Sequence, residues 1–127
     1  MHVYKTRWFA RFARHERITD ESLLDAIARA QRGLIDADLG GGLIKQRVAR
    51  KGQGRSGGYR MMIAYRVNDR AVFFYGFAKS DRENIDQDEL LTMRQIAGEL
   101  LAGDADRIAE AIRDNKIEEV PNAQEEA

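Results

Sequence analysis

The sequence predicts an α+β fold, in which a small antiparallel sheet of about four strands packs with two N-terminal helices and one C-terminal helix. Two stretches, 43–49 and 59–67, alternate as strands do, and the run at 71–78 is the most apolar of the chain. Because only short connections separate these three segments, we expect an antiparallel meander. The length of 127 residues fits one domain.

The N-terminal third is expected to hold a short strand and both early helices. Met1–Lys5 is predicted as a strand that joins the same sheet, and Thr6–His15 as a helix. A second helix starts near Thr19, a good N-cap residue. The segment Asp36–Gly42 is expected to be a flexible connector. In the first helix, three aromatic side chains recur at helical spacing and are expected to face the core: Trp8, Phe9 and Phe12.

Alternation along the predicted strands places several cations on one face of the sheet. On the strand 43–49, Lys45 and Arg47 share a face, and a glycine-rich turn over 50–58 leads to the next strand. If the helices cover one face only, the other face stays open. Four cations could then gather on the open face: Lys45, Arg47, Arg60 and Lys79.

The C-terminal third is predicted to be helical and then acidic. A helix is expected over Asp86–Leu101, where Asp86 and Glu89 have the spacing of a capping box. Gly103 ends it, and a further short helix is expected over Asp104–Asp114. Beyond Lys116 the acidic chain is expected to lack regular structure. We therefore divide the chain into residues 1–103, the main domain, and 104–127, an acidic C-terminal helix and tail.

The charge of the chain is strongly asymmetric, although its formal net charge is zero. Residues 1–82 hold 17 Lys+Arg against 8 Asp+Glu, and residues 83–127 hold 4 against 13, so the two parts carry +9 and −9. From Leu39 to Asn68 the chain has cations and no carboxylate. Such a segment favours a polyanionic partner, and the acidic part either solvates or shields the basic face.

Several classes of site are disfavoured by the residue types present. The chain has no cysteine, which excludes disulfides and thiolate metal sites and suits a reducing cytoplasm. His2 and His15 fall in different predicted elements, so no metal and no cofactor is expected. No apolar run approaches the roughly 20 residues that span a membrane. The GxGxxG pattern at 52–57 opens a strand and not a helix, which argues against dinucleotide binding.

Two motifs carry a resemblance to a known family. At Gly54–Arg60 (GRSGGYR) together with Tyr75–Lys79 (YGFAK), the sequence resembles the RelE-like toxins of bacterial type II toxin–antitoxin systems, over roughly residues 1–101. The resemblance implies a RelE-like fold and an mRNA interferase, which enters the ribosomal A site and cuts the messenger without a metal. The messenger's own 2′-hydroxyl attacks the adjacent phosphate. It also implies a cognate antitoxin, of the helix-turn-helix type, as partner.

The same resemblance assigns roles by position. Lys45 matches the family's strand lysine, a base or charge stabiliser, and Arg60 matches the arginine that holds the scissile phosphate. Lys79 and Arg82 fall in the family's basic segment after the last strand and are expected to join Lys45 and Arg60 as catalytic residues. An arginine stays protonated and is a poor base, whereas neighbouring cations should lower the pKa of Lys45. The remaining residues of the basic segment are expected to bind RNA: Arg47, Arg50, Lys51, Arg55 and Ser56.

The sequence departs from the family pattern at two positions, which leaves alternatives open. Many relatives place a Tyr or His where this chain has Asp86, and position 80, often basic in relatives, is Ser80. The acid–base partner therefore stays unassigned. One alternative is a RelE/ParE-superfamily protein without nuclease activity, which inhibits DNA gyrase or acts with its antitoxin as a repressor; another is a general RNA-binding module. Residues 104–127 could also fold back over the basic face, although a solvated tail is the simpler reading.

Overall fold

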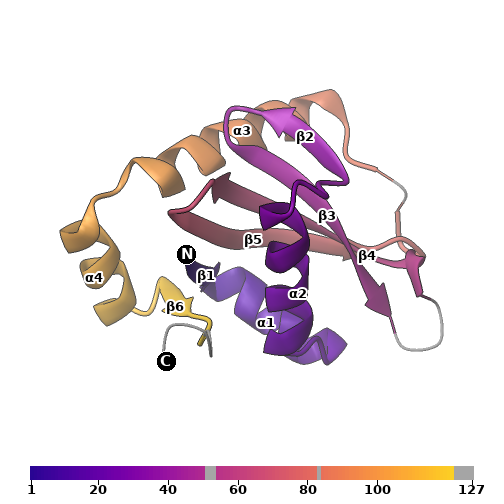
Figure 1. Ribbon diagram of the computed structural model, residues 1–127, viewed down its shortest axis with the longest axis horizontal. Coiled ribbons are helices and arrows are strands. Elements are labelled where there is room, and N and C mark those ends of the chain that lie inside the picture. Colours follow the sequence, from indigo (N-terminus) through magenta and orange to yellow (C-terminus); the bar gives the residue numbers. More distant parts are fainter. Residues whose placement is uncertain (51–53, 83, 122–127) are drawn as a thin grey trace.

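The computed structural model describes residues 1–50, 54–82 and 84–121, and in this part of the chain six strands form one sheet (Figure 1). The order across the sheet is β2-β3-β4-β5-β1-β6. The pairing of β1 with β5 is parallel and every other pairing is antiparallel, which confirms the α+β class and the β3–β4–β5 meander. The strands are β1 (His2–Thr6), β2 (Ala37–Gly40), β3 (Leu43–Arg50), β4 (Gly54–Arg66), β5 (Arg70–Ala78) and β6 (Ile117–Glu119).

The helices begin and end close to where the sequence predicts them. Thr6, Thr19 and Asp86 are N-caps whose side-chain oxygens accept hydrogen bonds from backbone N–H groups in the first turn. The predicted capping box is confirmed, because Glu89 also accepts a hydrogen bond from the Asp86 backbone. The helices are α1 (Arg7–Glu16), α2 (Asp20–Gln31), α3 (Gln87–Ala102) and α4 (Ala105–Arg113).

The expected number of about four strands is too low, because two short strands escape prediction. β2 lies in the segment expected to be a flexible connector, and three glycines with positive φ, at positions 40–42, turn the chain from β2 into β3. β6 lies in the segment expected to lack regular structure, and it pairs with β1. β4 is also longer than predicted, since it begins at Gly54 within the expected turn.

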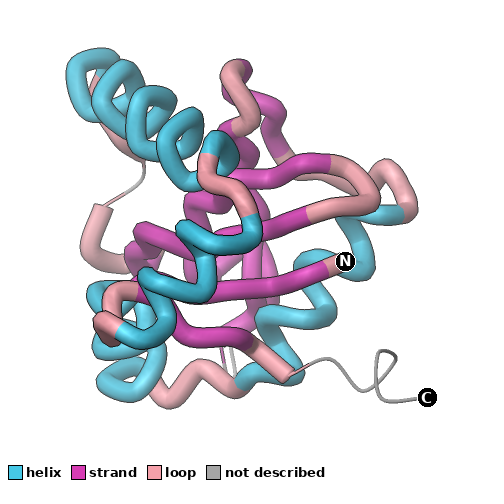
Figure 2. The backbone as a smooth tube through the Cα atoms, turned by 90° about the vertical axis from the view of Figure 1, so that its left-hand side faces the viewer, coloured by secondary structure: helices cyan, strands magenta, loops and turns pink. Residues whose placement is uncertain are grey.

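Helices cover both faces of the sheet, so the expectation of one open face is wrong. One core contains side chains of α1, α2 and the sheet face that includes Ile44, Val48 and Met61. The second core contains side chains of α3 and the opposite face, including Leu43 and Met62. Figure 2 shows the strands between these two groups of helices. α3 contacts β3 and β4 on this face, and Lys45 of β3 reaches the segment before α3, with its Nζ 3.5 Å from the Asn84 side-chain oxygen.

The aromatic side chains of α1 are only partly in the core. Phe9 is fully buried and Phe12 is half-buried, as expected, but Trp8 is 47% exposed. The parallel pairing of β5 with β1 runs only as far as Phe73. Trp8 packs beside the part of β5 that follows, where its ring stacks on Tyr75 with centroids 5.0 Å apart.

The acidic C-terminal segment does not cover the basic face over residues 104–121. β6 pairs with β1, and α4 packs against β6 at the end of the sheet opposite β2 and β3 (Figure 1). Lys5 of β1 forms an ion pair with Glu118 at 3.4 Å, and Val120 is buried. Whether residues 1–103 form a domain of their own stays a prediction.

Candidate functional site

Three cations from β3 and β4 lie on the α3 side of the sheet, and we call Lys45, Arg47 and Arg60 the cationic cluster. Lys45 pairs across the strands with Met62, and Arg47 pairs directly with Arg60. Because Met62 belongs to the core beneath α3, alternation places the cluster on that same side. Like charges directly opposite each other repel. An anion bound here would relieve this repulsion.

Two members of the cationic cluster, Lys45 and Arg60, are partly shielded from water, which changes their pKa values, whereas the Arg47 side chain is exposed. Arg60 is only 6% exposed, and its Nη1 donates to the Arg55 carbonyl oxygen at 3.3 Å. Burial, and then the Arg60 and Arg47 charges, lower the pKa of Lys45, whereas Asp36 raises it. Burial and Arg47 also lower the pKa of Arg60. The predicted lowering of the Lys45 pKa is confirmed, with burial as the larger cause.

Contacts with α2 and the loop after it hold β3 in place at the cluster. Asp36 Oδ2 accepts a hydrogen bond from the Arg47 backbone N–H at 2.6 Å, and Arg29 Nη2 donates to the Arg47 carbonyl oxygen at 2.6 Å. The buried Gln46 amide donates to the Ala26 carbonyl oxygen and accepts from the Asp36 backbone. These bonds fix the part of β3 that directly follows Lys45 before any ligand binds, which is the preorganisation that charge stabilisation requires.

Arg82 stands beside the cationic cluster, on the segment that leads into α3. Its Nη2 and Nη1 donate to the Glu89 carboxylate at 2.6 and 3.0 Å, and its guanidinium lies 5.4 Å from the Phe77 ring centroid. Arg82 Nε donates to the Asn84 carbonyl oxygen, while Lys45 Nζ reaches the Asn84 side-chain oxygen at 3.5 Å. The hydrogen bonds with Glu89 raise the pKa of Arg82, and those with Arg82 lower the pKa of Glu89 to about 2.

Comparison with known families decides what kind of protein carries this site. The family model of the RelE toxin of the RelE/RelB toxin–antitoxin system matches residues 1–120. The chain belongs to the RelE toxin family. A comparison with curated proteins and one with solved structures each gave no match. As a RelE-family toxin, the protein has an antitoxin as its partner.

The structure does not bring every predicted site residue of this RelE-family toxin to the cationic cluster. The guanidinium of Arg50 lies 5.6 Å from the Tyr59 ring centroid, and Tyr59 belongs to the core beneath α1 and α2. Arg50 Nη1 also donates to Ser80 Oγ at 3.3 Å. Arg55 lines a cleft beside α2. The register of β3 and β4 shifts between Val48 and Arg50, so alternation no longer assigns a face beyond this point.

The other predicted residues are less closely tied to the cluster. Lys79 follows β5 directly and its side chain is exposed, while its backbone N–H donates to the Gly58 carbonyl oxygen. Ser56 lies in β4, and Lys51 lies outside the described residues. The structure thus groups Lys45, Arg47 and Arg60, with Arg82 beside them.

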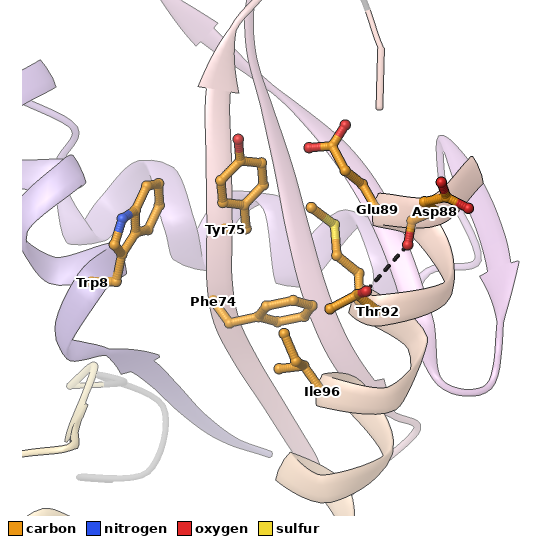
Figure 3. A pocket seen from close by; sticks show the side chains of 8 residues that line it. Trp8, Phe74, Tyr75, Asp88, Glu89, Thr92 and Ile96 are labelled. Carbon is orange, nitrogen blue, oxygen red and sulfur yellow. Dashed lines mark hydrogen bonds between the residues drawn. The ribbon is translucent and has the colours of Figure 1, made fainter. Parts of the chain in front are cut away.

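A pocket of about 460 Å³ beside the cluster was not predicted, and we call it the aromatic pocket (Figure 3). Residues from α1, β5 and α3 line it: Trp8, Phe74, Tyr75, Asp88, Glu89, Thr92, Met93 and Ile96. Sequence analysis assigns Trp8 to the core because its helical spacing matches that of Phe9 and Phe12. Only the position of β5 beside α1 shows otherwise.

Within residues 1–50, 54–82 and 84–121, no three His, Asp or Glu side chains are grouped so that they could hold a metal ion. In the same ranges, no helix is long and apolar enough to cross a membrane.

Proposed function

We propose that this RelE-family toxin is a metal-independent endoribonuclease that cuts messenger RNA on the ribosome and so inhibits translation in the cytoplasm. The observation that supports this most is the meeting of Lys45, Arg47 and Arg60 on one partly shielded face of β3 and β4. Guanidinium groups bind phosphate oxygens in a bidentate manner, and they are effective where water is partly excluded. Dependence on the ribosome and a helix-turn-helix antitoxin are carried over from the family.

The proposed reaction uses the messenger's 2′-hydroxyl as nucleophile. The 2′-oxygen forms a bond to the adjacent phosphorus, the bond from phosphorus to the 5′-oxygen breaks, and the products carry a 2′,3′-cyclic phosphate and a 5′-hydroxyl. In its neutral form Lys45 takes the proton from the 2′-hydroxyl, and the 5′-oxygen takes a proton from water. Arg60 stabilises the charge that grows on the non-bridging phosphate oxygens, and Arg47 and Arg82 bind the flanking phosphates.

The lowered pKa of Lys45 supports its role as the base, because a larger fraction of the amine is then neutral at a given pH. Two nearby carboxylates fit that role less well. Glu89 is bound by Arg82, which keeps the Glu89 pKa at about 2. Asp86, at the position where many relatives have Tyr or His, is the N-cap of α3.

The contacts at the N-terminus of α3 favour a second candidate function. Asp86 caps the helix, and Arg82 is held by Glu89. A protein that binds DNA gyrase, or a repressor complex with the antitoxin, needs no base at Asp86. Such a protein would arrest growth without cutting messengers.

Induced expression in cells, followed by mapping of messenger 5′ ends, tests the proposal. The variants are Lys45→Ala/Arg60→Ala and, as a matched control with the same residue types, Lys116→Ala/Arg113→Ala at the opposite end of the sheet. We expect new 5′ ends within translated codons for the wild type and the control, and none for the cluster variant. Growth arrest with intact messengers would instead support the second candidate.

A further inference from the structure

We propose that the aromatic pocket binds a purine base of the substrate RNA, one or two nucleotides from the scissile phosphate, and thereby sets a sequence preference. The inference rests on the proposed function and gives a role to residues that the reaction itself does not use. Figure 3 shows Trp8 and Tyr75 on one side of the pocket and Thr92 and Ile96 of α3 on the other.

The walls of the pocket suit a flat, largely apolar group. Trp8 is 47% exposed, Ile96 is 37% exposed, and Phe74, Tyr75 and Met93 complete the lining. Its volume of about 460 Å³ lies within the range of about 300–1,000 Å³ that small-molecule sites occupy. Trp8 already stacks on Phe12 and on Tyr75, with ring centroids 5.4 and 5.0 Å apart. A base in the pocket therefore stacks on the half-buried Tyr75 ring from the side opposite Trp8.

The register of three neighbouring strands relates the pocket to the cationic cluster. Lys45 pairs with Met62, and Met62 pairs with Tyr75, so the three residues lie in line on β3, β4 and β5. With strands spaced about 4.8 Å apart, the Lys45 and Tyr75 backbones are roughly 10 Å apart, a span that one or two nucleotides cover. The Phe77 ring lies 6.1 Å from Tyr75 and under Arg82, which links the two sites.

The charges at the aromatic pocket and at the cationic cluster determine which part of a nucleotide enters the pocket. Asp88 lies at the pocket and repels phosphate, whereas the charge of Glu89 is compensated by Arg82 and the cluster attracts phosphate. A ligand with an apolar flat group and an anion at a fixed distance matches both sites, and a nucleotide is such a ligand. Because stacking strength grows with ring area, a purine is favoured over a pyrimidine.

Fluorescence of Trp8 tests the proposal directly, since Trp8 is the single tryptophan of the chain. The full chain is titrated with three 2′-O-methyl trinucleotides, which it cannot cleave because they lack the 2′-hydroxyl. The first carries three adenines, the second carries three uracils, and the third has the same backbone without bases. We expect saturable quenching by the adenosine trinucleotide, weaker binding of the uridine one and no saturable quenching by the abasic one.

Variants separate the pocket from general effects on the fold. Tyr75→Leu keeps apolar volume but removes a stacking ring, and should weaken binding of the adenosine trinucleotide about tenfold. Ile96→Gln in the pocket should weaken it as well. Leu91→Gln on the outer face of α3, also at an exposed apolar position, should leave affinity unchanged.

The outcomes distinguish this inference from the proposed function. Equal quenching by the adenosine and abasic trinucleotides, no quenching at all, or equal loss in Ile96→Gln and Leu91→Gln would overturn the base-binding role, even if messengers are cut in cells. Quenching by an apolar segment of the antitoxin, and not by RNA, would identify a protein-docking site and overturn it too. Purine-selective quenching without messenger cleavage would support the pocket and count against the nuclease.

Discussion

Lys45 is the residue on which the proposed chemistry depends most. Burial and two neighbouring guanidinium groups lower its pKa, while Asp36 acts in the opposite direction. The groups that face it are Arg47, Arg60, Asp36 and Asn84. A neutral amine becomes more common as the pH rises through its pKa, so the lowered pKa moves the onset of base catalysis toward neutral pH.

Replacement of Arg47 by Gln should therefore shift the pH profile of cleavage. The Arg47 charge lowers the pKa of Lys45, so its removal raises that pKa, and the rate should reach its plateau at a higher pH than in the wild type. Single-turnover cleavage on programmed ribosomes, followed as a function of pH, measures this shift. A rate lowered by the same factor at every pH would show that Arg47 only binds phosphate.

The ion pair between Arg82 and Glu89 should contribute to the unfolding free energy at neutral pH and lose this contribution in acid. The pKa of Glu89 is lowered from 4.5 to about 2, so the pair stabilises the fold above pH 4.5, and this contribution is lost as the pH falls toward 2. Glu89→Gln keeps the capping geometry but removes the charge.

We expect the difference in unfolding free energy between wild type and Glu89→Gln to shrink over this acidic range in urea titrations. Glu99→Gln, on an exposed part of the same helix, is the control. A difference that stays constant with pH would contradict the assignment of this ion pair.

At the scale of single elements, helix ends and strand faces can be predicted from the sequence, but short edge strands cannot. Thr6–His15 and the capping box at Asp86 follow local rules of backbone hydrogen bonding. β2 and β6 have 4 and 3 residues and form only because β3 and β1 offer free edges.

The same contrast holds for the candidate site. Alternation predicts that Lys45, Arg47 and Arg60 meet, because a period of two needs no knowledge of distant parts. Alternation does not extend to Arg50, which was expected in the turn and lies where the register shifts. The contact between Trp8 and Tyr75 joins α1 to β5 across the chain, and no local pattern contains it.

The hairpin of β3 and β4 should tolerate no side chain at Gly58. A Cβ atom there would overlap the Val48 carbonyl oxygen and crowd the Arg50 backbone nitrogen, which cannot move without breaking the pairing. We expect Gly58→Ala to cost at least about 2 kcal/mol of unfolding free energy. Gly98→Ala is the matched control in α3, since its Cβ meets no atom within 4 Å, and should stabilise by about 0.5–1 kcal/mol. Equal effects in chemical denaturation would contradict this account of the hairpin.

At the scale of the whole molecule, residues 104–121 complete the sheet at its β1 edge. This acidic segment does not cover the cationic cluster. Val120 is only 1% exposed, and its backbone N–H donates to the Val3 carbonyl oxygen at 2.8 Å. The segment thus contributes to the core although its composition is polar.

Val120→Ala should therefore destabilise the entire chain by about 2 kcal/mol. The exposed neighbour Glu119→Ala should change the unfolding free energy by no more than about 0.5 kcal/mol. A Val120→Ala protein as stable as the wild type would show that the segment after Gly103 folds separately from the sheet.

The measurement that tests the central claim most directly is single-turnover cleavage of a messenger on programmed ribosomes, with and without the 2′-hydroxyl at the scissile nucleotide. We expect the wild-type toxin to leave a 2′,3′-cyclic phosphate and a 5′-hydroxyl on the ribose substrate and to leave the 2′-deoxy substrate intact. Lys45→Ala/Arg60→Ala should be inactive on both, and Lys116→Ala/Arg113→Ala should match the wild type. Cleavage of the 2′-deoxy messenger, or full activity of the cluster variant, would contradict the assignment of this face as the nuclease site.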